Sequence, residues 1–149
     1  MSMEDKEIKQ LIADYLTAHN TLTLATVTPE NKPIAHTVEY ASEGTTVYIG
    51  TSNSRRKVQN ILKNPHVAYT VDEDYKDWLT IKGVQMEGIA TVLSRKEDIE
   101  HAAGVYIGKF PFVAQFPPNP EMVFIKIEPT VGSFLDYTKG FTHSDTVTF

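Results

Sequence analysis

The first patterned segment of the chain carries apolar residues at helical spacing. Ser2 and Asp5 stand three positions apart, as in a capping pair that opens a helix, and the pattern fades near residues 19–20. Steps of three or four residues place the apolar positions on one face of that helix. These positions are Ile8, Leu11, Ile12, Tyr15 and Leu16. The segment is therefore predicted to be an amphipathic helix that lies on the surface of a larger core.

The pattern then changes to an alternation of apolar and polar residues, which is typical of half-buried β-strands. Turns at 29–33 and 42–44 separate the first three strands, so these strands are predicted to form an antiparallel meander. A short helix over 58–62 follows and ends before Asn64-Pro65, because a proline cannot continue a helix. The strands predicted in this half of the chain are 21–28, 34–40, 45–49 and 66–71.

The second half of the chain continues the β pattern and contains one more helix. Strands are predicted over 78–93, with a break near Lys82-Gly83, and over 122–136. Gly83 and Gly88 indicate a bulge or a close approach of another group. A capping box at 94–97 opens the third helix, which is predicted to end at Gly108. Residues 109–120 form an aromatic and proline-rich loop, and the tail 137–149 has no clear pattern.

These elements predict a mainly β protein with short helices, of the α+β class. Six or seven strands with three inserted helices indicate a small barrel, because the regular strand–helix alternation of a parallel sheet is absent. At 149 residues and 41% hydrophobic content, the chain suits one domain, 1–149, with a single core.

Composition and charge exclude several classes of function. The chain has no cysteine, so disulfides, thiol catalysis and thiolate metal sites are excluded. A formal charge of −5 argues against nucleic acid as a partner. The chain shows no signal peptide and no apolar run long enough to span a membrane, so we expect a cytoplasmic protein without a membrane partner. The histidines lack metal-ligand spacing, and no metal site is predicted. No nucleophile with its base is evident, so any catalysis would require a cofactor.

Residues 50–57 are the most informative segment for function. They read Gly-Thr-Ser-Asn-Ser-Arg-Arg-Lys and join a predicted strand to a predicted helix, with Ser54 or Asn53 as the expected cap. This places three cations in the first helical turn, where the helix dipole disfavours positive charge. The cations could simply extend into water. Alternatively, they could bind a phosphate together with hydroxyls and free backbone amides. The position after a strand and a hydroxyl-rich turn favours phosphate binding.

The order of these parts resembles that of the pyridoxamine 5′-phosphate oxidase-like superfamily, whose members are flavin-binding split β-barrels. Each motif is short, and the resemblance rests on their order and spacing along most of the chain. It predicts a Greek-key antiparallel split barrel of six to seven strands with peripheral helices. The motifs are Thr23–Val27, Pro33–Val38, Tyr48–Thr51, Arg55–Lys57, Asn64–Val67 and Val84–Ala90, followed by the helix over 94–106.

The resemblance implies a homodimer that binds FMN in two clefts at the subunit interface. Arg56 and Lys57 would hold the FMN phosphate, helped by nearby hydroxyls and the helix N-terminus. Backbone groups of 35–38 would face the flavin ring. Gln85 would reach the edge of this flavin ring or of the flavin ring in the neighbouring site. Alternatively, it would occupy an ordinary outward position on its strand. The implied cofactor-binding residues are Ala35, His36, Thr37, Val38, Gly50, Thr51, Ser52, Ser54, Arg56, Lys57 and Gln85.

The chain also departs from the vitamin B6 oxidases of this superfamily. Those enzymes begin the flavin-facing strand with an arginine and carry a basic residue near its end, whereas 34–41 has neither. Their arginine-containing C-terminal substrate segment is also missing, and 142–144 does not replace it. We therefore do not expect this chain to oxidise pyridoxamine phosphate.

Two functions stay open at this point. The first is a flavin-dependent oxidoreductase that acts on an unidentified small molecule, with Tyr40, Trp78 or the 110–116 loop covering the ring. The second is a non-enzymatic flavin- or haem-binding carrier, store or redox sensor, in which His143 would be an axial haem ligand. The sequence identifies neither substrate nor electron donor, and leaves FMN, another flavin, a deazaflavin and haem as alternatives.

Overall fold

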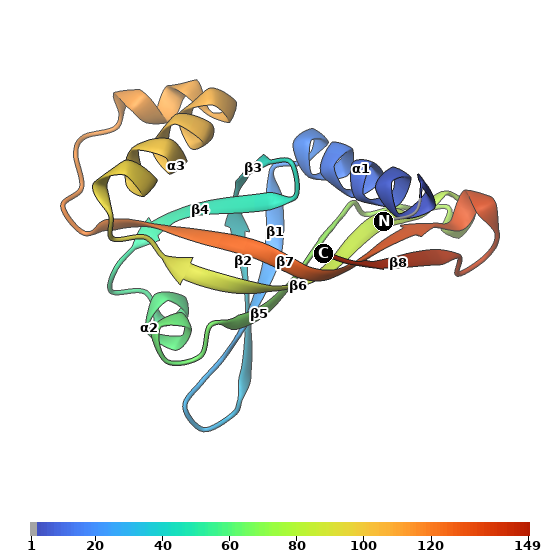
Figure 1. Cartoon of the computed structure of the whole chain (residues 1–149), viewed down its shortest axis with the longest axis horizontal. Helices are drawn as coiled ribbons and strands as arrows, with labels where there is room; N and C mark the ends of the chain where they lie inside the picture. Colours follow the sequence, from blue (N-terminus) through green and yellow to red (C-terminus); the bar gives the residue numbers. More distant parts are fainter. Residues whose placement is uncertain (1–2) are drawn as a thin grey trace.

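The computed structural model describes residues 3–149, and its elements follow the predicted order (Figure 1). The first half contains α1 (Met3–Ala18), β1 (Thr21–Val27), β2 (Pro33–Glu39), β3 (Ala41–Glu43), β4 (Thr46–Ser52), α2 (Arg56–Lys63) and β5 (His66–Asp72). The second half contains β6 (Lys82–Val92), α3 (Lys96–Lys109), β7 (Met122–Asp136) and β8 (Ser144–Thr148). Three short 3₁₀ turns, η1 (Trp78–Thr80), η2 (Pro111–Gln115) and η3 (Tyr137–Lys139), complete the chain.

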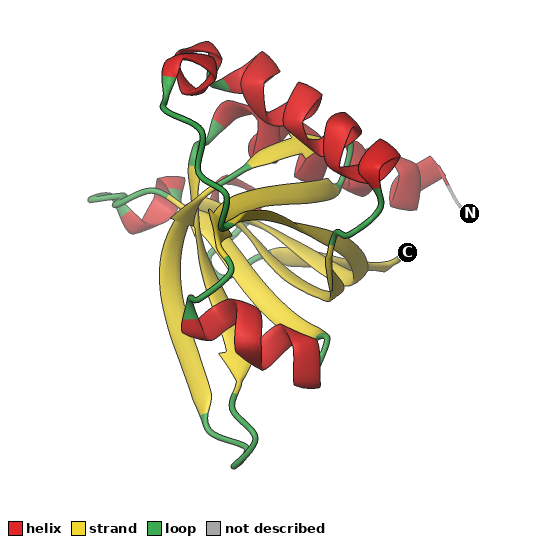
Figure 2. Ribbon diagram, turned by 90° about the vertical axis from the view of Figure 1, so that its left-hand side faces the viewer, coloured by secondary structure: helices red, strands yellow, loops and turns green. Residues whose placement is uncertain are grey.

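All the strands belong to one antiparallel sheet, in the order β2-β1-β5-β6-β7-β4-β3, with β8 also paired to β7. The sheet curls until β2 and β4 approach each other without forming a ladder, and Figure 2 shows this curvature from the side. The result is a barrel that is split between β2 and β4. The predicted α+β fold, an antiparallel split barrel with peripheral helices, is confirmed.

The main core fills the inside of the curl. Every second residue of the strands points inward, and Leu24, Ile49 and Ile125 are fully buried there. The apolar face of α1, including Ile12 and Leu16, covers one end of this core, as its spacing predicts. A second, smaller cluster lies on the outside of the sheet and packs α3 against it; its buried members are Ala41, Tyr48, Leu93, Ala102, Tyr106 and Phe124.

Gly88 marks the bulge that the sequence indicated. The register between β6 and β7 shifts between Glu87 and Gly88, and Gly88 lies opposite Pro129. A Cβ atom at Gly88 would lie 2.7 Å from the carbonyl oxygen of Glu128, so a side chain is excluded here. A proline in a central strand removes a ladder hydrogen bond and is tolerated at bulges. The bulge therefore lets β7 continue through Pro129 as one strand of 15 residues.

Several boundaries differ from the prediction. Trp78 does not begin a strand, because the Asp77 side chain accepts a hydrogen bond from the amide of Leu79 at 2.9 Å and fixes the turn η1. β6 then runs through Gly83 without a break. β4 extends through Ser52 because β7 pairs along its whole length. The tail, which had no clear pattern, forms η3 and β8.

The helix ends also required corrections. α3 is capped by Arg95 rather than by Ser94, makes no side-chain capping bond and continues to Lys109 past Gly108. The predicted cap of α1 rests on Ser2, which lies outside the described residues. Over residues 3–149, no helix combines the length and the apolar character needed to cross a membrane.

Candidate functional site

The segment 50–57 leaves the sheet at the end of β4 and turns directly into α2. Pairing of Ser52 with Met122 holds the end of the strand against β7. Beyond it, the amide of Asn53 donates to the carbonyl of Glu121 at 2.8 Å, and the amide of Arg55 donates to the carbonyl of Ser52 at 3.1 Å. These backbone hydrogen bonds fix the path of the turn and therefore the position of residues 55–57, which follow it.

The expected side-chain cap of α2 is wrong. The cap residue is Arg55, which is extended and makes no side-chain capping bond. The Ser54 hydroxyl lies 3.2 Å from the Ser52 hydroxyl, which in turn donates to a Glu121 carboxylate oxygen at 3.3 Å. These serines therefore bond to each other and to Glu121 instead of capping the helix, which leaves the first amides of α2 without a side-chain acceptor.

Buried contacts hold α2 in place. The side-chain amide of Asn60 donates to the hydroxyl of Thr26 on β1 at 3.0 Å, and both groups are buried. Val58 and Ile61 join the main core. Because β1 is the ladder partner of β2, these contacts bring the start of α2 to the split side of the barrel.

Lys57 is a buried cation without an internal partner. Its residue is 8% exposed, and within the described chain it forms no hydrogen bond or ion pair. Burial lowers the pKa of Lys57, and the nearby charge of Arg55 lowers it further. Buried charges in proteins are normally paired. Within the described residues no carboxylate neutralises Lys57, which leaves its ammonium group available to an anion.

His36 faces the same place from β2. It alternates with the exposed Ala35 and Thr37 and so lies on the inner side of the strand. Its Nδ1 is buried and has no hydrogen-bond partner in the part of the chain that the structure describes. Burial lowers the pKa of His36, and the charges of Lys57 and Arg56 lower it further. The structure thus brings three basic groups together at the split, and none of them is neutralised by a carboxylate.

The other predicted cofactor residues lie elsewhere. Val38 belongs to the core, whereas Ala35 and Thr37 lie on the outer face of the sheet. Gln85 is on that outer face too, in a row that runs from Thr37 through two threonines, Thr23 and Thr70. Since neighbouring strands are about 4.8 Å apart, three steps separate Thr37 from Gln85 by about 14 Å. Gln85 is therefore not brought to the phosphate candidates of its own chain.

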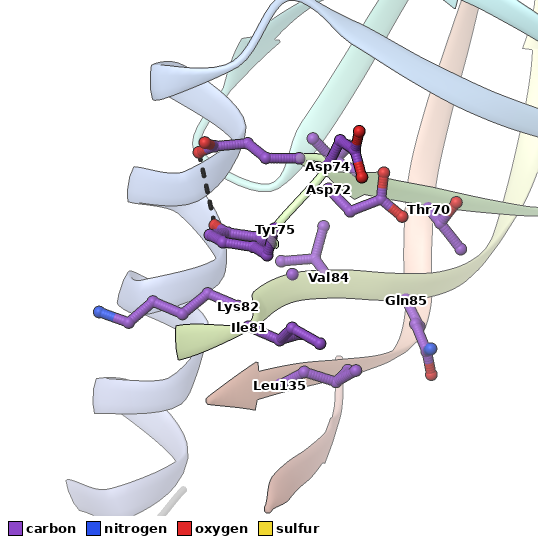
Figure 3. Close-up of a pocket in the computed structure, with 12 residues that line it drawn as sticks. Thr70, Asp72, Asp74, Tyr75, Ile81, Lys82, Val84, Gln85 and Leu135 are labelled. Carbon is purple, nitrogen blue, oxygen red and sulfur yellow. Dashed lines mark hydrogen bonds between the residues drawn. The ribbon is translucent and has the colours of Figure 1, made fainter. Parts of the chain in front are cut away.

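Gln85 instead lines a cavity of about 240 Å³ where β5 ends and β6 begins (Figure 3). The acidic residues Asp72, Glu73 and Asp74 form part of its wall, and the Tyr75 hydroxyl donates to Glu73 at 3.4 Å. In Figure 3 the amine of Lys82 extends away from the carboxylates of Asp72 and Asp74. Negative charge makes this cavity unsuitable for a phosphate. Across residues 3–149, no group of three or more carboxylate or histidine side chains is placed to hold a metal ion.

Comparison with known proteins identifies the family. The family model described as pyridoxamine 5′-phosphate oxidase matches residues 6–136. The chain belongs to this family. General stress protein 26 of Bacillus subtilis (strain 168) is 27% identical over 127 residues, which cover 85% of this chain and 87% of that protein.

Solved structures resemble this member of the pyridoxamine 5′-phosphate oxidase family in fold. A haem-binding protein from Mycobacterium smegmatis has a TM-score of 0.77 at 19% identity, with 94% of this chain covered. Campylobacter jejuni ChuZ has a TM-score of 0.79 at 17% identity, with 96% covered. The chain spans only 57% and 60% of those two proteins, respectively. At such identities the likeness concerns the fold alone.

The aromatic residues that could cover a flavin ring in this pyridoxamine 5′-phosphate oxidase family member differ in their exposure. Tyr40 is fully buried, and its hydroxyl donates to the carbonyl of Leu16 at 2.6 Å, so it cannot cover a bound ring. Trp78 is exposed and stacks on the exposed Phe141, with ring centroids 6.3 Å apart. The aromatic residues of the 110–116 loop lie on the α3 side of the sheet.

Sequence reasoning missed a second cation that is withdrawn from solvent, the half-buried Lys109. Lys109 donates to the carbonyl oxygens of Leu16 and His19 and lies 4.2 Å from the centroid of the Tyr40 ring. Burial lowers the pKa of Lys109 to about 8. The carbonyls follow the last turn of α1, where a cation is favoured. The sequence shows a basic residue near the end of the third helix but not its partners. The two carbonyls that it contacts lie 93 and 90 residues away in the sequence.

Proposed function

We propose that this chain binds FMN at the start of α2 and acts as a flavin-dependent oxidoreductase on a small molecule. One observation carries the proposal: Lys57 is buried without a partner, beside Arg56 and the unbonded Nδ1 of His36. A phosphate group supplies the negative charge and the acceptor atoms that these groups lack. Membership of the pyridoxamine 5′-phosphate oxidase family supports a flavin nucleotide as the carrier of that phosphate.

Residues around the cations complete the proposed phosphate site. Thr51, Ser52 and Ser54 offer hydroxyls, and Gly50 begins the segment without a side chain. The uncapped amides at the start of α2 add backbone donors of the kind that bind phosphate at helix N-termini. β2 pairs with β1 on one edge only, so its free edge, around 35–38, offers backbone groups to the polar edge of the ring. Bound FMN would supply the electron-transfer chemistry.

The proposal includes a homodimer with the cofactor at the interface. A ring beside β2 cannot be reached by Gln85 of the same chain, and the exposed Trp78 also lies outside the core. A second copy of the chain would cover the side of the flavin ring that one chain leaves exposed. The outer sheet face suits such a contact because its side chains are mostly small or uncharged and remain exposed or half-exposed; they are Thr23, Ala25, Ala68, Thr70, Gln85 and Glu87. Light scattering of the purified protein should give the mass of two chains.

The substrate of this proposed enzyme is not pyridoxamine phosphate. Neither β2 nor β8 carries an arginine or lysine that could hold the substrate phosphate. Haem is not proposed either. The His143 ring lies with its Nε2 3.0 Å from a carboxylate oxygen of Asp145, and the residue directly precedes β8 rather than lying in a free tail.

The proposal is tested by titrating FMN into the wild type and into Arg56→Ala/Lys57→Ala, followed by absorption and flavin fluorescence. The double variant loses two charged donors, each worth about 1.5–3 kcal/mol, so its affinity should fall by about 100-fold or more. Arg95→Ala/Lys96→Ala is the matched control, because it removes the same charges from the exposed start of α3. The control should bind FMN within about twofold of wild type.

Unchanged FMN affinity in Arg56→Ala/Lys57→Ala would overturn the assignment of the phosphate site. The oxidoreductase part is tested separately on the FMN-loaded protein. The bound flavin should be reduced by NADH or NADPH and reoxidised by an added electron acceptor. If it binds tightly but undergoes neither reaction, a flavin carrier replaces the enzyme as the proposed function.

A further inference from the structure

A groove lies on the α3 side of β4, on the face opposite the main core. Its larger part has a volume of about 450 Å³. The floor is formed by Gly50, Met122 and Phe124, and the walls by α3 and the segment from η2 to Asn119. The wall residues are almost all apolar or aromatic, among them Tyr106, Ile107, Val113, Ala114 and Phe116.

The groove continues into a polar end. An adjoining cavity of about 330 Å³ shares Gly50, Asn119 and Met122 with the larger part and is otherwise lined by Thr51, Ser52 and Arg55. Arg55 is exposed, and its guanidinium forms no hydrogen bond or ion pair with any described residue. The two cavities therefore make one groove, apolar at one end and cationic at the other.

Several features keep the apolar part open to solvent. Phe116 is 60% exposed and Met122 is 40% exposed. A Cβ atom at Gly50 would lie 2.9 Å from the terminal methyl of Met122. The missing side chain at this position thus allows Met122 to lie across β4 and form the floor. Large exposed apolar surfaces next to polar groups are typical of binding sites.

The cations of the 55–57 triplet serve two different places. Arg56 and Lys57 act on His36, on the inner side of β2. Arg55 lines the groove on the α3 side, together with Gly50 and Ser52. The apolar part of the groove is therefore separate from Lys57 and His36, whereas its polar end shares Gly50, Thr51 and Ser52 with the proposed phosphate site.

We propose that this groove binds an amphipathic organic anion, with an acyl chain or aromatic body in the apolar part and a carboxylate at Arg55. The volume falls in the range of about 300–1,000 Å³ that holds small organic molecules. Arg55 supplies a charge-assisted hydrogen bond to the acid. The Glu121 carboxylate accepts the Ser52 hydroxyl at 3.3 Å and does not itself line the groove, so its repulsion of the anion acts from behind Ser52. The inference goes beyond FMN binding, because apart from Gly50 the apolar part of the groove is formed by residues that have no role in the proposed FMN site.

The test is calorimetric titration of the purified protein with dodecanoate and with dodecanol, both below the concentration at which they form micelles. Dodecanoate should bind saturably, with one molecule per chain. Ala114→Trp fills the apolar part and should weaken dodecanoate by at least about tenfold. Gln115→Trp, at the neighbouring exposed position outside the lining, is its control and should bind as the wild type does.

Arg55→Gln tests the polar end of the groove. It should weaken dodecanoate by about tenfold or more and leave dodecanol unchanged, because only the acid uses the guanidinium. Absence of saturable binding, or binding unaffected by both Ala114→Trp and Arg55→Gln, would overturn the proposal. A lower oligomer mass in Ala114→Trp, measured by light scattering, would overturn it in favour of a contact between copies of the chain. FMN affinity should be the same in Ala114→Trp as in the wild type, whatever its value, which separates this test from that of the proposed function.

Discussion

Lys57, which is buried, and Lys109, which is half-buried, both have a pKa that burial lowers, yet their surroundings differ. Lys109 donates to the carbonyls of Leu16 and His19 and lies over the ring of Tyr40. Lys57 has no such partner, and the groups near it are basic. Both lysines lie at helix ends, Lys109 beside the C-terminal end of α1 and Lys57 at the N-terminal end of α2. Only the first of these ends favours a cation.

The difference separates a cation with structural contacts, Lys109, from one that we propose binds a ligand, Lys57. Contacts within the chain offset part of the desolvation cost of Lys109, and through them the residue ties α3 to α1. The cost of Lys57 is not offset by any described contact. A residue that lowers stability without a partner is typical of functional sites, where local rules are broken for binding. Exchanging each lysine for an apolar residue of similar length should therefore have opposite consequences.

The largest effect on stability is expected for Lys109→Met. The exchange removes the ammonium donor from two carbonyls and the cation over Tyr40, and should lower the free energy of unfolding by about 2 kcal/mol. Urea unfolding followed by circular dichroism measures this change. Lys76→Met, in an exposed loop, should change stability by less than about 0.5 kcal/mol. Equal effects of the two exchanges would show that the Lys109 contacts contribute nothing.

A smaller effect with the opposite sign is expected for Lys57→Met in the protein without ligand. Methionine removes an unpaired buried charge while keeping most of the side-chain volume, so the free energy of unfolding should rise by about 1 kcal/mol. The same urea experiment measures it. Loss of stability in this variant would mean that Lys57 has a structural partner, and the contrast with Lys109 would disappear.

The smallest effect concerns pH. Burial and the charges of Lys57 and Arg56 hold the pKa of His36 below its usual value in the free protein. A bound phosphate dianion would raise this pKa, so binding takes up a proton. Affinity should therefore increase as the pH falls through the pKa of the complex, and level off below the pKa of the free protein.

His36→Asn isolates this contribution from the titration of FMN itself, because asparagine does not titrate. The ratio of wild-type to variant affinity should rise toward low pH by at most about tenfold per pH unit, the limit for one proton. Fluorescence titration at a series of pH values measures the ratio. A ratio that does not change with pH would place His36 outside the phosphate site.

Most of the fold was predictable because its signals are local. The spacing of Ile8, Ile12 and Leu16 predicts α1, and the alternation over 21–27 predicts β1. The elements that were missed depend on distant pairing. β8 and the last residues of β4 become strands only because β7 lies beside them. η1 is fixed by a single side chain, that of Asp77, within a segment whose apolar residues resemble a strand.

The candidate site was predictable only in part. The misplaced charges of Arg56 and Lys57 could be recognised from the sequence, because helix position and charge are both readable there. The inward orientation of His36 and the separation of Gln85 from its own phosphate candidates depend on sheet register, which sequence patterns do not fix. Arg56 and Lys57 face His36, whereas Arg55 faces the α3 side of the sheet. This depends on the direction in which the turn leaves β4.

The length of β7 also has a consequence for the order of assembly. β7 pairs with β6, β4 and β8 and is made from residues 122–136, close to the end of this sequence. During synthesis, β2 and β5 can pair with β1, and β6 with β5, as soon as they emerge, because each of these partners is made earlier. β4 cannot join them, because its connection to that group passes through β7. The turn that carries Arg55, Arg56 and Lys57 is therefore among the last parts to be fixed, and a nascent chain acquires the proposed anion-binding sites only when the barrel closes.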